Sequence, residues 1–143
     1  MKDFRIEDHT GEAIRALAEV LPVALEEIGL HLEGEAKEEL SNSPKRIDTG
    51  LLRNSITHGL GGQPPAVTSY KGDKPRDGSV PSGSYSGTLP GDDLTAYIGT
   101  NVEYAPYIHE GTDRLAPNRF LKNAITKNMD QVRERIKKAL EGA

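Results

Sequence analysis

A helical periodicity in the first third of the chain constrains the fold more than any other feature. From about Gly11 to Ser41, apolar residues recur at steps of three and four, which predicts one long amphipathic helix. The apolar positions are Ile14, Leu17, Leu21, Leu25, Ile28, Leu32, Ala36 and Leu40. Pro22 removes one internal hydrogen bond, so we expect a kink or a break between Ala18 and Leu21. A helix weakened in this way must be held by packing against other parts of the chain.

The end of the chain carries a second helical periodicity. The segment after Pro117, as far as about Glu141, predicts one continuous helix that stops before Gly142. Its apolar stripe consists of Leu121, Ile125, Met129, Val132, Ile136 and Leu140. Burying such a stripe contributes roughly 1.5–3 kcal/mol for each large side chain. We therefore expect that a chain cut before Val132 does not fold stably.

The polar faces of these two predicted helices differ in charge. Glutamates dominate the first face, whereas lysines and arginines dominate the second. Two interpretations are open: both faces are solvated, or the acidic face of one subunit contacts the basic face of a neighbour. Exposed ion pairs add only roughly 0–1 kcal/mol each, so such a contact would set the orientation of subunits more than their affinity.

Two short segments between the predicted helices alternate in the manner of strands. They are Ser55–Leu60 and Leu94–Gly99, and they predict a small, mainly antiparallel sheet. The segment Gly61–Asp93 between them is dense in glycine, proline and serine, and a loop of that length is uncommon in a compact domain. Within it, Val67–Tyr70 and Ser84–Leu89 predict a two-stranded β-finger. Such a hairpin is marginal by itself, so we expect it to order against a partner.

Length and composition predict one domain that spans residues 1–143, with residues 61–93 as its extended loop or β-finger. The chain has 143 residues and a hydrophobic fraction of 35%, enough for one modest core. It contains no cysteine, which excludes a disulfide framework and a thiolate metal site. No apolar run approaches the roughly 20 residues that cross a bilayer. The predicted fold class is α+β, with the sheet packed against a long N-terminal helix and a C-terminal helix.

Four side chains are the candidates for enzymatic chemistry: His58, His109, Glu110 and Asp113. The chain contains neither an HExxH motif nor a His-x-His pair. The adjacent His109 and Glu110 are also expected to point in different directions on any regular element. A GxSxG pattern at residues 83–87 lies in the flexible segment, where no base is held near the serine. A metal-dependent hydrolase that uses His109 and Glu110 is nevertheless one alternative.

A nucleic-acid-binding accessory protein is a second alternative, based on the basic face of the last helix. However, the chain has 22 acidic against 18 basic residues, so its net charge of -4 gives no overall attraction to phosphates. No stacking aromatic residues are interleaved with the basic residues of that helix. Sequence-independent contact with a phosphate backbone is all that this pattern supports.

The residues from Asp48 to Ser55 have a structural interpretation. Asp48 or Thr49 is placed to cap a single helical turn, with Leu52 in the core and Arg53 outside it or paired with a carboxylate. Gly50 allows a close approach of the backbone before the chain enters a strand at Ser55.

A second structural turn is predicted at Tyr104–Thr112. Tyr104, Ala105, Pro106 and Tyr107 form a short helical turn that buries Ile108, and the tyrosine hydroxyl groups receive hydrogen-bond partners such as His109 or a carboxylate. Glu110–Thr112 then reverses the chain, with Gly111 supplying a positive φ. In this interpretation His109 and Glu110 are structural braces.

Three segments, taken in order, carry a family resemblance: DTGLLRNSI, NVEYAPYIHEGT and APNRFLKNAI. Together they resemble the signature segments of a family of small tail components of long-tailed bacteriophages, described as tail-completion or head–tail joining proteins. The resemblance covers about Leu25 to Leu140. It implies an α+β subunit that forms a ring, expected to be sixfold, at the neck between the head connector and the tail tube. It implies no catalytic residues, no metal and no cofactor.

The resemblance also implies partners, a location and a set of residues. The expected partners are further copies of the chain, head-connector proteins and tail-tube or tail-terminator proteins, with passive contact with DNA in the lumen and no membrane. The expected location is the tail or neck of the virion, and the host cytoplasm during assembly. The implied interface and structural residues are Asp48, Thr49, Gly50, Leu52, Arg53, Ser55, Tyr104, Ala105, Pro106, Tyr107, His109, Glu110, Gly111, Thr112, Pro117, Phe120 and Leu121.

Overall fold

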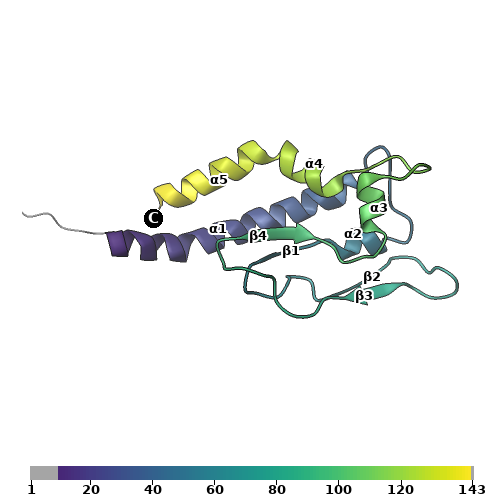
Figure 1. Cartoon of the computed structure of the whole chain (residues 1–143), viewed down its shortest axis with the longest axis horizontal. Coiled ribbons are helices and arrows are strands. Elements are labelled where there is room, and N and C mark those ends of the chain that lie inside the picture. The colour runs from purple at the N-terminus through teal and green to yellow at the C-terminus, as the bar shows by residue number, and fades with distance from the viewer. Residues whose placement is uncertain (1–9, 143) are drawn as a thin grey trace, which may run out of the picture.

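The computed structural model of the chain describes residues 10–142, and it confirms the α+β fold class (Figure 1). A long helix packs against a two-stranded antiparallel sheet on one side and against the C-terminal helices on another. The elements are α1 (Thr10–Glu39), α2 (Leu51–Ser55), β1 (Thr57–Leu60), β2 (Ser69–Lys71), β3 (Ser82–Ser84), β4 (Ala96–Gly99), α3 (Ala105–Glu110), α4 (Phe120–Lys127) and α5 (Met129–Glu141). Among the described residues, no helix is long and apolar enough to span a bilayer.

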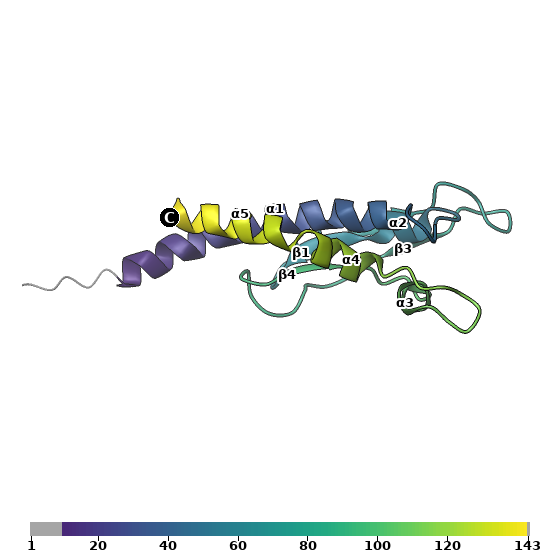
Figure 2. The same ribbon diagram turned by 90° about the horizontal axis from the view of Figure 1, so that it is seen from above.

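The first predicted helix is correct in extent, and of the kink or break expected between Ala18 and Leu21 no break is present. Helix α1 runs without interruption from Thr10 to Glu39, although its axis bends gently in the N-terminal part (Figure 2). Proline removes only one hydrogen bond, and packing of the following turns compensates for it. Ala24, Ile28 and Leu32 are buried on the face that meets the sheet and the C-terminal helices.

The predicted C-terminal helix is in fact two helices. It begins at Phe120 rather than directly after Pro117, and Asn128 separates α4 from α5 with φ -116° and ψ 12°. The Asn128 side chain is buried and donates a hydrogen bond of 2.7 Å to the backbone carbonyl of Ala124. This bond gives a partner to one of the last carbonyl groups of α4.

The break also changes which side chains of the two helices are buried. In α4 the buried residues are Phe120 and Ala124, one position ahead of the predicted stripe, while Ile125 is exposed. Helix α5 runs back along α1, antiparallel to it, and buries no residue completely (Figure 1). The expectation that folding depends on a buried stripe from Val132 onward therefore loses its basis.

The central strands are predicted correctly, with both starting two residues later than expected. Strands β1 and β4 pair antiparallel, with Thr57 opposite Gly99 and Leu60 opposite Ala96. Residues 61–93 are not a structureless loop, because β2 and β3 pair antiparallel within them. The second strand of this hairpin lies at Ser82–Ser84, ahead of the predicted Ser84–Leu89. The hairpin also packs against α2, so its base is part of the body of the domain.

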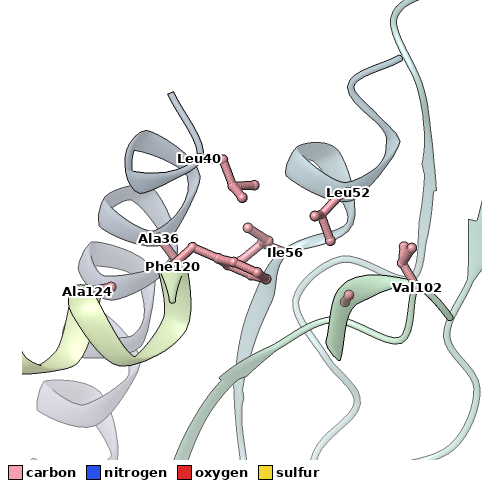
Figure 3. Close-up of a cluster of buried hydrophobic side chains, with 8 residues drawn as sticks. Ala36, Leu40, Leu52, Ile56, Val102, Phe120 and Ala124 are labelled. Atoms are coloured by element: carbon pink, nitrogen blue, oxygen red, sulfur yellow. The ribbon is translucent and has the colours of Figure 1, made fainter. Parts of the chain in front are cut away.

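The core lies at the C-terminal half of α1, where four segments of the chain meet. The ring of Phe120 is completely buried and points from α4 toward Ile56 (Figure 3). The cluster consists of Ala36, Leu40, Leu52, Ile56, Val102, Ala105, Phe120 and Ala124. This cluster fixes the relative positions of α2, α3 and the start of α4.

Candidate functional site

The three segments that carry the family resemblance fold together around this core. Leu52 from the first segment, Ala105 from the second and Phe120 from the third are all buried in the same cluster. Leu121 packs against the cluster from outside and is partly buried. Segments that are up to about 70 residues apart in the chain therefore form one structural unit.

The first segment holds the base of the hairpin. The backbone carbonyl of Thr49 accepts hydrogen bonds from the backbone N–H groups of Asp73, at 2.6 Å, and Lys74, at 3.1 Å. Gly50 has φ 86°, and a Cβ there would collide with the Asp73 carboxylate, so glycine is required for both reasons. The Thr49 hydroxyl accepts from the N–H of Leu51 at 3.3 Å, but the N-cap position of α2 is Gly50 rather than Asp48 or Thr49. Asp48 is exposed and instead forms an ion pair with Arg76 of the hairpin.

Ser55 links the end of α2 to Thr100, the residue that follows β4. Its side chain is completely buried, donates to the backbone carbonyl of Leu52 at 2.6 Å and shares a hydrogen bond of 2.6 Å with the hydroxyl of Thr100. Its backbone carbonyl accepts from the hydroxyl of Tyr85 at 2.5 Å. The Tyr85 ring lies against Tyr70, with ring centroids 5.4 Å apart, so the hairpin is anchored here as well.

The tyrosines of the second segment are not buried, contrary to the prediction. Tyr107 is 62% exposed and Tyr104 is 40% exposed, while Ala105 is buried beneath them. Partial burial raises the pKa of the Tyr104 phenol, and the positive charge of Arg76 opposes that shift. Pro106 is exposed in the first turn of α3, where its missing N–H removes no helical hydrogen bond. Helix α3 therefore presents two aromatic rings on the surface of the molecule.

His109 links α3 to the first turn of α4. Its Nε2 accepts a hydrogen bond of 3.3 Å from the backbone N–H of Lys122, one of the donors that the start of α4 leaves unpaired. Its Nδ1 then carries the proton and donates to the Glu110 carboxylate at 2.7 Å, so the two adjacent side chains do meet, contrary to the prediction. The ring also packs edge-on against Phe120, with centroids 5.3 Å apart. This geometry is that of a brace between two helices.

Glu110 completes this contact at the surface. The hydrogen bond from His109 is the main cause that lowers the pKa of Glu110, and Arg119, whose Nε lies 3.5 Å from the carboxylate, lowers it further. Gly111 follows with φ 80°, as predicted, and a Cβ there would meet the backbone of Leu115 and Pro117. Thr112 pairs with Leu115 in a tight turn that leads to the exposed Pro117.

Asn118 is a structural residue that the sequence analysis missed. Its buried side chain donates to the backbone carbonyl of Glu39 and to that of Pro44, both at 2.9 Å. Its backbone N–H donates to the carbonyl of Ile108 at 2.9 Å. One amide therefore joins the end of α1, the following turn and α3. The only sequence signal is its position just before a predicted helix, and this position does not point to contacts with α1 or α3.

A cavity of about 430 Å³ opens where the first two segments meet. Its walls include the apolar side chains of Leu51 and Leu115 and both tyrosines of α3. Its cationic residues are Lys45, Arg46, Arg53 and Arg76, and Asp48 is the acidic residue beside them. The guanidinium of Arg46 donates to the backbone carbonyl of Ala116 at 2.7 Å, but its buried Nε has no partner among the described residues. The full lining is Lys45, Arg46, Ile47, Asp48, Thr49, Gly50, Leu51, Leu52, Arg53, Arg76, Tyr104, Tyr107, Ile108 and Leu115.

His58, a candidate ligand in the sequence analysis, lies apart from His109 and forms a different cluster. Its Nε2 is 2.7 Å from the Glu26 carboxylate and its Nδ1 is 3.0 Å from that of Glu33, both on α1. Gly29 makes room for the ring, because a Cβ at this position would lie only 3.1 Å from it. The carboxylates contact opposite nitrogens, so the three groups do not converge on one point. Within residues 10–142, no group of three or more His, Asp or Glu side chains could hold a metal ion.

Comparisons of the chain with protein-family models, curated proteins and solved structures find no match. The resemblance to a phage tail-component family therefore rests on the three segments alone.

Proposed function

We propose that this chain is a non-enzymatic structural protein of a phage virion, which completes the tail or joins it to the head connector as part of a ring at the neck. The observation that carries the proposal is the convergence of the three resembling segments on one core, beneath one surface. On that surface lie two exposed tyrosines, a partly apolar cavity and four cationic side chains. Exposed aromatic and arginine side chains around an apolar centre are typical of protein interfaces.

The polar groups of this unit also support a structural role. The imidazole of His109 bonds the backbone of α4 on one side and Glu110 on the other, so both ring nitrogens are engaged within the protein. Thr49, Ser55 and Asn118 likewise form hydrogen bonds with backbone groups of the chain. A hydrolase based on His109 and Glu110 would have to break this brace to free its base.

Assembly is proposed to proceed from weak association in solution to a ring that docks on its partners. Copies of the chain, a head-connector protein and a tail-tube or tail-terminator protein are the proposed partners, and sixfold symmetry is the proposed ring symmetry. The base of the hairpin is already bonded to the body, so the segment that would order on docking is limited to its exposed tip, residues 74–80. Ordering of that tip would add an entropic cost that keeps premature assembly weak.

The test is complementation of a phage that lacks this chain with a matched pair of variants. Tyr107→Ala removes the most exposed aromatic ring of the surface, and Leu140→Ala removes a large side chain that is 46% exposed on α5, away from it. Both variants are expected to fold. We expect Tyr107→Ala to leave filled heads and tails unjoined, and Leu140→Ala to restore infectious particles. Normal particles with Tyr107→Ala, or particles that never contain the chain, would refute the proposal.

A further inference from the structure

The outer edge of β4 offers backbone hydrogen-bonding groups that the chain does not use. The N–H of Gly61 donates to the carbonyl of Thr95 at 2.9 Å, which makes this a hydrogen-bonded pair of the β1–β4 ladder. Such pairs alternate along an antiparallel ladder, so Tyr97 and Gly99 also bond toward β1. Ala96 and Ile98 consequently direct their N–H and C=O groups away from β1. Within residues 10–142, no hydrogen bond reaches those groups.

Each of the other three strands has at least one outward carbonyl with a partner. The carbonyl of His58 on β1 accepts from the N–H of Ala66 at 2.9 Å. On the hairpin, the carbonyl of Lys71 accepts from the side chain of Asn54 at 2.9 Å. The carbonyl of Ser84 accepts from the side chain of Asn101 at 2.8 Å. Within the described residues the outer edges of β1, β2 and β3 are thus at least partly closed, whereas both outward carbonyls of β4 are open.

The surroundings of this open edge suit an added strand. Residues 95–100 contain no charged residue and no proline, the two features that proteins use to prevent edge pairing. A hollow of about 230 Å³ lies beside the edge, lined by Leu32, Ile98 and Ile125 among others. Leu94, which is 52% exposed, extends the apolar surface at the start of the strand. An incoming strand would find backbone partners along β4 and apolar surface on one face.

We propose that a second copy of this chain covers the edge, with the two β4 strands antiparallel across a twofold axis. The occupant must be an extended strand with free donors and acceptors at every second residue. Of the four described strands, only β4 has two successive outward carbonyls that both lack a partner. Pairing Ala96 with the partner's Ile98, and the reverse, forms four backbone hydrogen bonds and leaves neither copy with an open edge. No like charges meet within the paired residues.

This contact does not rest on the proposed function. It uses the β4 edge, whereas the proposed assembly surface lies at α2 and α3, around the cavity. A twofold contact also closes on itself, whereas a sixfold ring requires two different surfaces on each copy. The two interfaces can therefore be tested separately with the same protein.

The first test measures the mass of the full chain by sedimentation equilibrium over a range of concentrations. The wild-type chain is expected to double in mass as its concentration rises. Ala96→Pro removes an outward N–H without removing a β1–β4 bond, and should weaken the dimer at least tenfold while leaving the helical circular dichroism unchanged. Ser82→Pro is the matched control, because its N–H also points outward, on the hairpin, and this variant should dimerise like the wild type.

The second test uses the absence of cysteine in the chain. In the proposed register Tyr97 faces the partner's Tyr97, at the close spacing of a non-hydrogen-bonded pair. Mild oxidation of Tyr97→Cys should therefore yield covalent dimers, whereas Thr88→Cys, on the exposed loop before β4, should yield none above background.

Three results would overturn the edge pairing: a wild-type chain that stays monomeric, association that Ala96→Pro leaves unchanged, or equal cross-linking of the two cysteine variants. Sixfold association that Ala96→Pro does not affect would remove the edge pairing and leave the proposed ring in place. An edge-paired dimer from a chain that is absent from particles would remove the proposed function alone.

Discussion

Single side chains in this protein form hydrogen bonds with backbone groups that the ends of its helices leave unpaired. Helix α4 has no cap from its own N-cap residue, Arg119, and receives one from His109 on α3. Asn118 serves the end of α1 in the same way. Because α2, α3 and α4 are short, their ends make up much of their length, so these contacts decide whether they form.

Replacement of His109 tests the brace at this scale. His109→Ala removes the cap of α4 and the contact with Phe120, and should lower the free energy of unfolding by about 1–2 kcal/mol. Urea denaturation followed by circular dichroism measures this loss. His31→Ala is the control, because the Nε2 of His31 is buried without a hydrogen-bond partner among the described residues. An equal loss in both variants would show that His109 is not a brace.

The lowered pKa of Glu110 predicts a dependence of stability on pH. Because the carboxyl group has a lower pKa in the folded chain than in the unfolded chain, its contribution is fully present above the unfolded value of about 4.3. The contribution is lost as the pH falls through the folded pKa. Urea titrations from pH 6 to pH 3 should therefore show a steeper decline for the wild type than for Glu110→Gln. Parallel declines would contradict the pairing with His109.

At the scale of elements, segments with strong hydrophobic periodicity were predicted correctly, whereas features that depend on tertiary contacts were not. Helix α1 follows from the spacing of its apolar residues, and β1 and β4 follow from their alternation. The division at Asn128 could not be predicted, because asparagine is tolerated within helices and its bond to Ala124 exists only once α4 has formed. The pairing of His58 with Glu26 and Glu33 joins residues 32 and 25 positions apart, so no local pattern could reveal it. In the candidate site, the close backbone approach at Gly50 and the positive φ of Gly111 were predicted, whereas the exposure of Tyr104 and Tyr107 depended on how α3 packs.

The junction between α1, α3 and α4 is the element-scale feature most open to test. Asn118→Ala removes a donor from the carbonyls of Glu39 and Pro44, of which that of Glu39 also accepts from the N–H of Asn42, and should cost about 1–3 kcal/mol of stability. Asn123→Ala is the matched control, because its single contact with Glu39 is long, at 3.5 Å, and its loss should cost less than 1 kcal/mol. Thermal and urea unfolding measure both. Similar losses in the two variants would contradict the role given to Asn118.

The hairpin provides a second test at this scale. The N–H of Gly72 donates to the carbonyl of Pro81 at 2.8 Å, and Asp73 donates to Thr49, so amides at the base should be protected in the free chain. Amides of the exposed tip, residues 74–80, should gain protection only in assembled particles, apart from Lys74, which bonds Thr49, and from Arg76 and Ser79, which bond each other. Hydrogen exchange followed by mass spectrometry compares the two states. Equal protection of the tip in both states would exclude ordering on assembly.

At the scale of the whole molecule, the chain is a long helix that carries a small sheet, with its core gathered toward one end (Figures 1 and 3). The predicted contact between the acidic and basic helix faces of neighbouring subunits has an intramolecular counterpart. Helix α5 lies beside α1 in the same chain, and Glu19 and Glu27 line one groove with Arg135 and Lys138. These charges are therefore close to each other before any subunits meet. The surface around α2 and α3 remains the one that we propose for assembly.

Symmetry-resolved imaging of intact phage particles, with this chain carrying a small inserted label, tests the proposed role most directly. The expected result is label density in a sixfold ring at the neck, between the head connector and the tail tube, with the α2 and α3 surface against a neighbouring protein. Particles of full infectivity that contain no copy of the chain would contradict the proposed role.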